Sequence, residues 1–154
     1  IFLGAMLSLL VCLMFTGCSN SETNSTSRGL TDFAHIEEEY LATIDSLNWP
    51  DGITLPDKLE DEDTGASFQV GYGETRASYL WEYSWMKEWL DTYNTDPERA
   101  EKALEELEKA FDMPYMGIDR CDDATRNYLR ENIDKAKLGD PSGFTESIRA
   151  NYAN

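Results

Sequence analysis

The sequence predicts an all-α protein, a small bundle of four to five helices with one long irregular loop over about residues 48–73. Two observations predict this class. Apolar residues recur at three- and four-residue spacing in several segments, which is the period of an amphipathic helix. Most of these segments also begin at a residue that caps helices well, and several end near a glycine or a proline.

The chain divides into three parts, residues 1–17, residues 18–30 and residues 31–154. The first part is uncharged and almost entirely apolar, as in a secretory signal peptide. The second part is rich in Ser, Thr and Asn, and such a composition cannot bury enough apolar surface to fold, so we expect a flexible tether. The third part carries the helical periodicity, and its length suits one acidic domain.

The end of the apolar run resembles the lipobox of bacterial prolipoproteins. Phe15 stands at the apolar position of that motif, and Thr16 and Gly17 stand at its two small positions. Cys18 stands at the position of the invariant cysteine. The resemblance implies that a dedicated signal peptidase removes residues 1–17, and that Cys18 carries a diacylglycerol on its sulfur, with fatty chains such as palmitate.

Two features depart from the usual motif. Phe15 replaces the common leucine, and no basic segment precedes the apolar run, so we expect the signal peptide to begin upstream of Ile1. Cys12 is a poorer acceptor than Cys18, because the preceding Val11 is not small.

The resemblance implies that the protein is anchored to a bacterial cell membrane on its extracytoplasmic side. Each buried CH₂ of a fatty chain contributes about 0.8 kcal/mol, and two chains hold a protein stably where one does not. The residue after the cysteine is Ser19 and not an aspartate. In a host with two membranes, the resemblance then implies the outer membrane. The residues alone leave two alternatives open, a cleaved signal without lipid and an uncleaved helix, although a spanning helix needs about 20 apolar residues.

The composition excludes some classes of partner. Thirteen basic and 30 acidic residues give a formal net charge of −17, so we expect no nucleic-acid partner. The charge either keeps the protein soluble or attracts a basic partner or a divalent cation. After processing, Cys121 is the one unmodified cysteine, so an internal disulfide is excluded. Its thiol is either buried or open to an intermolecular bond.

The first helix is expected from Thr31 or Asp32, either of which can cap it, to Leu47. Its acidic cluster at residues 37–39 is expected to be solvated, near His35. The loop that follows contains a Pro-Asp-Gly turn, an acidic run and a short alternating stretch that suits an extended strand. A loop of this length is unusual in a compact domain and often has a function.

The second helix is expected over about residues 74–93 and is the most apolar. Trp81, Trp85 and Trp89 repeat every fourth residue, and the apolar arc spans roughly 200° of the helix. The narrow polar strip that remains consists of Ser84, Lys87, Glu88 and Asp91. We therefore expect this helix at the centre of the bundle.

Three shorter helices are expected after it. They cover about residues 96–112, 122–138 and 140–152. Asp96 with Pro97 opens the first of them, and Asp122 or Asp123 caps the second. Gly139 ends the second.

Few residues suit catalysis or metal binding. The single histidine, His35, excludes two-histidine metal sites and lies among carboxylates rather than near a nucleophile. Asp61 and Asp63 are weak metal candidates, because an EF-hand counted from Asp61 would need glutamate at its twelfth position, which is Tyr72. Residues 71–73, Gly-Tyr-Gly, lack the third glycine of a dinucleotide-binding loop. We expect no cofactor.

The tryptophan row has two interpretations. As core filling, it explains the broad apolar arc of the helix. As a partly exposed aromatic platform, extended by Trp49, Tyr72 and Tyr79, it could stack on sugar rings or on the apolar groups of a partner.

The sequence therefore favours a lipid-anchored binding or accessory module of a bacterial cell envelope that acts through protein contacts and is not an enzyme. The first alternative is a receptor for a small ligand or glycan that uses the tryptophan-rich helix. The second is a glycosidase, which would need a pair of facing carboxylates that the sequence does not single out.

Overall fold

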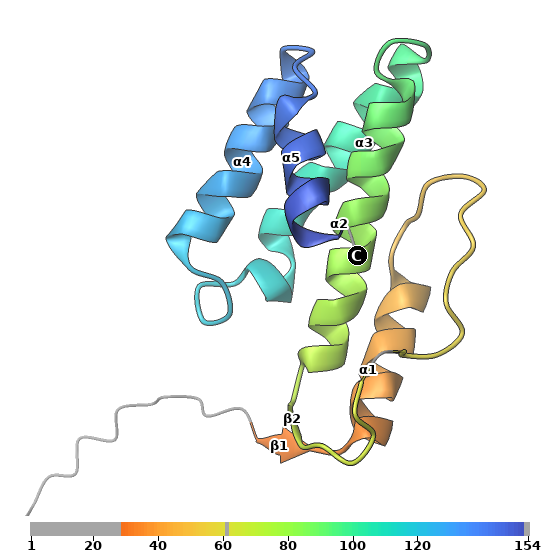
Figure 1. Ribbon diagram of the computed structural model, residues 1–154, viewed down its shortest axis with the longest axis vertical. Coiled ribbons are helices and arrows are strands. Elements are labelled where there is room, and N and C mark those ends of the chain that lie inside the picture. Colours follow the sequence, from red (N-terminus) through yellow and green to blue (C-terminus); the bar gives the residue numbers. More distant parts are fainter. Residues whose placement is uncertain (1–28, 61, 153–154) are drawn as a thin grey trace, which may run out of the picture.

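The computed structural model describes residues 29–60 and 62–152. The lipobox residues 15–18 and the weak metal candidate Asp61 lie outside these ranges, so what the sequence predicts for them stays a prediction. The described residues form five α-helices, two short 3₁₀ helices and one two-stranded sheet (Figure 1). In chain order the elements are β1 (Leu30–Thr31), α1 (Phe33–Ser46), β2 (Phe68–Gln69), α2 (Tyr72–Thr92), α3 (Pro97–Glu108), η1 (Lys109–Asp112), η2 (Pro114–Met116), α4 (Asp123–Lys137) and α5 (Ser142–Asn151). The predicted all-α class is confirmed.

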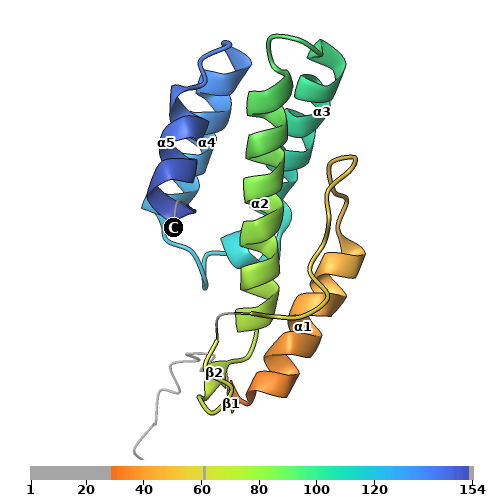
Figure 2. The same ribbon diagram turned by 45° about the vertical axis from the view of Figure 1, so that its right-hand side comes forward.

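The helix at the centre of the bundle is α2, as the sequence predicts. In Figures 1 and 2, α1 lies along the N-terminal half of α2 and α3 lies along its C-terminal half. The helices α4 and α5 form a pair on the side of α2 away from α1. The strands β1 and β2 pair antiparallel, with Leu30 opposite Gln69, beside the start of α2.

The tryptophan row of α2 lies in the core. Trp81 and Trp85 are each 1 % exposed and Trp89 is 2 % exposed. The indole N–H groups of Trp81 and Trp85 both donate to the carbonyl oxygen of Asn48, at 2.9 and 3.1 Å, which ties the loop after α1 to α2. Trp89 packs its ring edge-to-face against Phe144 of α5, at 5.4 Å between centroids. The exposed-platform interpretation is therefore wrong for these three rings, because the core encloses them.

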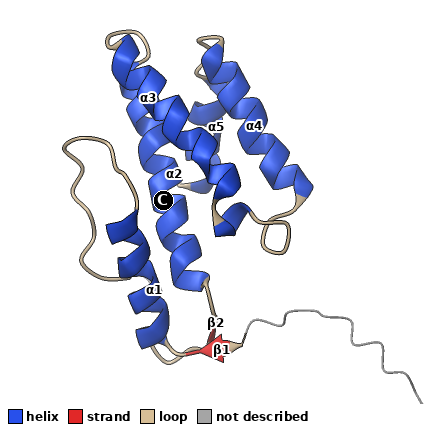
Figure 3. Ribbon diagram, turned by 180° about the vertical axis from the view of Figure 1, so that it is seen from behind, coloured by secondary structure: helices blue, strands red, loops and turns tan. Residues whose placement is uncertain are grey.

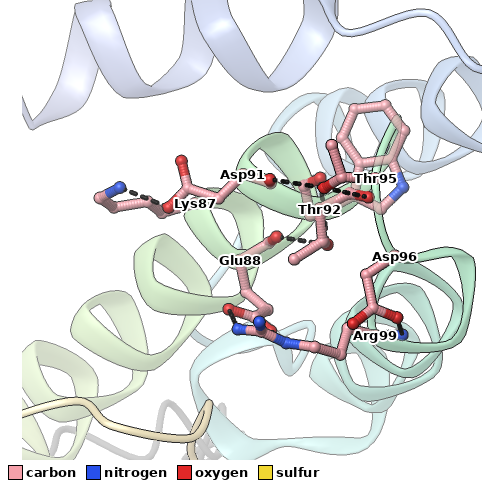
Figure 4. A network of polar contacts seen from close by, with 8 residues as sticks. Lys87, Glu88, Asp91, Thr92, Thr95, Asp96 and Arg99 are labelled. Carbon is pink, nitrogen blue, oxygen red and sulfur yellow. Dashed lines mark hydrogen bonds and ion pairs between the residues drawn. The ribbon is translucent and has the colours of Figure 1, made fainter.

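A polar network joins the end of α2 to the start of α3 (Figure 4). Arg99 donates to Glu88 through two nitrogens, at 2.7 and 2.9 Å, which is the bidentate geometry of strong ion pairs. Asp96 caps α3 by accepting the backbone N–H of Arg99. Ser84, however, does not belong to the solvated strip that the sequence predicts. It is buried, and its hydroxyl is satisfied by donating to the carbonyl of Leu80.

The helices α4 and α5 form a closely packed hairpin (Figure 3). Asp122 caps α4 by accepting the N–H of Thr125 at 2.8 Å. Gly139 follows the end of α4 with a φ of +79°, which allows the chain to turn back at once. Gly143 then lets α5 approach α4, since a Cβ at that position would lie 2.6 Å from the Oδ1 atom of Asn132.

Acidic residues fasten the long loop to the helices. The loop spans residues 47–67, shorter than the predicted 48–73, because β2 and the first two residues of α2 occupy its expected end. Glu37 of α1 accepts the backbone N–H of Leu59 at 3.2 Å. Glu62 accepts the hydroxyl proton of Tyr72 at 2.8 Å and pairs with Arg76. The prediction that the cluster at residues 37–39 is solvated is therefore wrong for Glu37.

Glu39 is also not solvated, because it holds the start of α2. Its carboxylate accepts the backbone N–H of Gly71, at 2.8 and 2.9 Å to the two oxygens, and that of Gly73 at 3.2 Å. Both glycines are needed. Gly71 has a φ of +89°, and a Cβ at Gly73 would lie 1.8 Å from the carbonyl oxygen of Ile36. The amides that a glycine-rich turn could offer to a phosphate are thus bound by the protein itself.

Replacing Glu39 by alanine should destabilise the protein by about 2 to 4 kcal/mol, because it leaves two buried backbone N–H groups without an acceptor. The matched control is Glu38→Ala, one residue earlier on the exposed side of α1, which should change stability by less than about 0.5 kcal/mol. Urea unfolding followed by circular dichroism measures both. Equal effects of the two variants would show that the carboxylate does not hold α2.

Candidate functional site

The aromatic residues that the sequence proposes for a binding surface do not form one platform. The three tryptophans of α2 are in the core. Trp49 is half-buried, and its N–H donates to the carbonyl of Ile44 at 2.9 Å. Tyr72 is bound to Glu62 and packs against β2. Tyr79 is 40 % exposed and belongs to a different site, a cleft on the far side of α2 from α1.

This cleft has a volume of about 780 Å³ and lies between α2 on one side and α4 and α5 on the other. Four tyrosines line it, so we call it the tyrosine cleft. They are Tyr79 and Tyr83 of α2, Tyr128 of α4 and Tyr152 at the end of α5. One carboxylate, Glu82, and one guanidinium, Arg76, also line it.

Glu82 is the buried charged residue of the described cleft lining, with only 7 % of its surface exposed. Helix geometry places it there, because Trp85, Met86 and Trp89 follow it at the spacings that share one helix face. Its Oε2 atom accepts the hydroxyl proton of Tyr115 at 2.7 Å. Its other oxygen accepts no hydrogen bond from any residue that the structure describes, and it is not enclosed, because the one buried side-chain nitrogen or oxygen without a partner in the described ranges is Nδ2 of Asn132. The carboxylate is therefore half-satisfied within the protein.

The partner of Glu82 is positioned by η2. Pro114 begins this single 3₁₀ turn, and its other two residues, Tyr115 and Met116, are buried. The ring of Tyr79 packs edge-on against Tyr115, at 5.6 Å between centroids. A second tyrosine pair, Tyr83 with Tyr152, lies at 5.0 Å and joins α2 to the end of α5. The walls of the cleft are thus held by ring–ring contacts between different elements.

Burial changes the proton affinity of the groups around the cleft. Desolvation raises the pKa of Glu82 to about 7, and the hydrogen bond from Tyr115 opposes this rise. Burial, together with the negative charge of Glu82, also raises the pKa values of Tyr79, Tyr115 and Tyr152 above the usual value for a tyrosine. These phenols therefore stay protonated through neutral pH, and Tyr115 remains the donor to Glu82.

The positive charge at the edge of the cleft is already paired. Arg76 forms its ion pair with Glu62 of the long loop, and it donates weakly to the hydroxyl of Tyr72 at 3.4 Å. Glu62 is largely buried by this arrangement, while Arg76 is more exposed. The guanidinium is therefore directed to the loop, and Glu82 is left without a cationic partner among the described residues.

The number of carboxylates in the cleft bears on the glycosidase hypothesis. A glycosidase uses two carboxyl groups that face each other across the scissile bond. Among the described residues that line the cleft, Glu82 is the one carboxylate. A concave cavity that is lined by four tyrosines and contains one carboxylate without a cationic partner has the composition of a small-ligand site.

The other candidate residues lie apart from the cleft. His35 is half-exposed and lies 3.3 Å from Glu39, among carboxylates as the sequence predicts. Asp63 is exposed and accepts the N–H of Gly65 in its own turn. Within residues 29–60 and 62–152, no group of three or more His, Cys, Asp or Glu side chains is placed to hold a metal ion. Cys121 is a free, half-buried thiol 3.6 Å from the sulfur of Met116.

Two further cavities are smaller. One of about 170 Å³ lies next to Tyr79 and Arg120, and Arg120 is paired there with Glu74 at 2.7 Å. The other, of about 450 Å³, lies beside α3 and is lined by acidic residues of that helix and by Lys137. Neither is lined by a buried charged side chain among the described residues, whereas the tyrosine cleft is lined by Glu82, so the tyrosine cleft is the stronger candidate.

Compared with known proteins, the chain matches no family model, no curated protein and no solved structure. In the described ranges, none of the helices has the length and apolar character needed to cross a membrane.

The sequence contains a signal for Glu82 that the pattern of charges alone conceals. The polar strip of α2 consists of residues on the opposite side of the helix, whereas Glu82 lies between Trp81 and Tyr83 in the apolar arc. A carboxylate within the apolar face of a central helix is expected to be buried, and a buried carboxylate is a candidate site residue. Its partner Tyr115, 33 residues away, has no such signal.

Replacing Glu82 by glutamine should stabilise the protein at high pH. The pKa of Glu82 is raised from 4.5 to about 7 in the folded state. Between these two values the folded protein keeps a proton that the unfolded chain releases, so the stability of the wild type falls as the pH rises from about 4.5 to about 7. We expect Glu82→Gln to exceed the wild type by on the order of 1–3 kcal/mol at pH 8, and the difference to shrink toward pH 5.

Urea unfolding of both proteins at pH 5, 6, 7 and 8 measures this difference. The matched control is Glu106→Gln of α3, which has the same 7 % exposure but is paired with Lys109 at 2.6 Å and does not line the cleft. Glu106→Gln should not raise the free energy of unfolding at pH 8. If the difference in unfolding free energy between Glu82→Gln and the wild type were the same at every pH, it would contradict a buried charge at Glu82.

Proposed function

We propose that the protein is a lipid-anchored binding module on the extracytoplasmic side of a bacterial cell membrane, and that it binds a small ligand in the tyrosine cleft. The lipobox-like residues 15–18 support the anchor, and the composition of residues 18–30 supports a tether between membrane and domain. In a host with two membranes, the residue after Cys18 favours the outer membrane.

The observation that carries the binding proposal is the half-satisfied carboxylate of Glu82. Burying a carboxylate without a cationic partner costs several kcal/mol, and Glu82 has only the neutral hydroxyl of Tyr115 as its partner. A carboxylate whose pKa is raised by burial and that lines a cleft is a candidate site residue. The cleft that contains Glu82, about 780 Å³, has the size of small-molecule sites, which range over about 300–1,000 Å³.

A small ligand accounts for the cleft better than a flat protein contact does. The sequence favours a module that acts through protein contacts first, and a receptor that binds a small ligand on the tryptophan row second. With the tryptophans in the core, the ligand site moves to the neighbouring face of the same helix, where Tyr79 and Tyr83 border the cleft. The concave shape and the buried carboxylate both support this second function in its new position.

The anchor is tested by labelling with radioactive palmitate in a bacterial host that expresses the full-length protein. We expect the label on the wild type and its complete loss in Cys18→Ser, because the lipid is attached through that sulfur. Cys12→Ser is the matched control and should keep the label. A labelled Cys18→Ser protein, or an unlabelled wild type, would contradict the anchor.

The ligand site is tested by NMR with a library of neutral, cationic and anionic fragments, added to the mature protein in a non-ionic detergent. We expect amide shifts that cluster at the tyrosine cleft. Thr125→Trp, which adds a large side chain to an exposed residue of the cleft lining, should abolish them. Ala124→Trp is exposed and lies outside the lining, so it should preserve them. Fragments that bind only elsewhere, or none at all, would contradict the proposal.

A further inference from the structure

We propose that the ligand of the tyrosine cleft is a small organic ammonium ion, which places its positive nitrogen against the free oxygen of Glu82 and its methyl or methylene groups against the tyrosine rings. This inference rests on the proposed function, because it assigns a chemical class to the ligand of the same cleft.

The charges in the cleft favour a cationic ligand. Glu82 and Arg76 are the charged residues among the described lining of the cleft. The charge of Arg76 is neutralised by Glu62, whereas Glu82 has only the neutral hydroxyl of Tyr115 as a partner. A cation is the ligand that offsets a buried, uncompensated carboxylate most strongly.

The tyrosine rings that line the cleft also favour an ammonium ion. The electron-rich faces of aromatic rings attract ammonium groups, and surrounding rings are the usual means by which proteins recognise alkylated amines. Four tyrosines line this cleft, and two of them, Tyr79 and Tyr128, are each 40 % exposed and so retain ring surface for a ligand. Their hydroxyl groups do not compete for Glu82, since Tyr115 is the tyrosine that bonds to it.

The same molecule already places cations over rings elsewhere. The guanidinium of Arg130 lies 4.6 Å from the ring centre of Phe111, and the ammonium of Lys102 lies 5.8 Å from that of Trp85. The net charge of −17 also raises the concentration of cations near the surface and lowers that of anions. The net charge of the protein and the lining of the cleft therefore both favour a positively charged ligand.

Two other ligand classes fit less well. An anion would meet the unpaired charge of Glu82 and the negative surface. A neutral sugar could stack on a tyrosine and donate a hydroxyl to Glu82, but it would leave the buried charge without compensation. The sugar is therefore a result that the experiment must be able to detect.

The experiment compares two probes of nearly identical shape, choline and 3,3-dimethyl-1-butanol, which differ by the positive charge. Isothermal titration calorimetry at pH 8 measures each against the mature protein, in a non-ionic detergent that contains no amine. We expect choline to bind at least tenfold more tightly than the neutral alcohol. Methyl glucoside serves as the sugar probe and should bind more weakly than choline.

Two variants connect this preference to the cleft. Glu82→Gln keeps an acceptor for Tyr115 and should remove the preference for choline, while Glu106→Gln should retain it. Tyr128→Leu removes one exposed ring face from α4 and should weaken choline binding severalfold, and it remains informative if Glu82→Gln fails to fold.

The outcomes separate this inference from the proposed function. Equal affinity for choline and the alcohol, or tighter binding of methyl glucoside, would overturn the ammonium assignment and leave the cleft as a ligand site. Absence of choline binding, while neutral fragments bind the cleft in the NMR screen, would do the same. A preference for choline that survives Glu82→Gln would also overturn it, because the charge would then be recognised at another place.

Discussion

The carboxylate of Glu39 is the contact on which the position of the central helix depends. It binds the backbone amides of Gly71 and Gly73, and at Gly73 the backbones of α1 and α2 approach too closely for any side chain. Farther along α2, Trp81 and Trp85 share the carbonyl of Asn48, so α2 is attached to the α1 side of the molecule at two levels. Because α2 supplies one wall of the tyrosine cleft, these contacts also fix that wall, and a ligand would meet a surface that is already ordered.

The helices could be predicted from the sequence because their signals are local. Asp32, Asp96 and Asp122 each cap a helix by accepting the N–H three residues later, and Gly139 provides the left-handed turn after α4. Each of these interactions joins residues that are neighbours in the chain, so composition and spacing reveal them. The central position of α2 followed from its broad apolar arc, and the burial of its tryptophans agrees with the core interpretation.

The contacts that join distant segments could not be predicted in the same way. Glu39 lies 32 residues before Gly71, and Glu82 lies 33 residues before Tyr115. A run of acidic residues is usually solvated, and nothing local distinguishes the exposed Glu38 from Glu37 and Glu39, which accept backbone N–H groups. Glu82 is the exception, since its place in the apolar arc of α2 is visible in the sequence even though its partner and its cleft are not.

The two sides of α2 explain how the domain can retain an unfavourable carboxylate. Burying a large aromatic side chain removes about 150–250 Å² from water, so each core tryptophan contributes several kcal/mol at about 25 cal/mol per Å². The uncompensated charge of Glu82 costs less than this, so the core can tolerate it. The fold itself uses an oxygen at position 82, because an apolar residue there would leave the buried hydroxyl of Tyr115 without its acceptor. A neutral glutamine would also provide that acceptor, so the fold does not need the negative charge. The charge of Glu82 is therefore the feature that folding leaves unexplained and that the proposed ligand of the cleft would use.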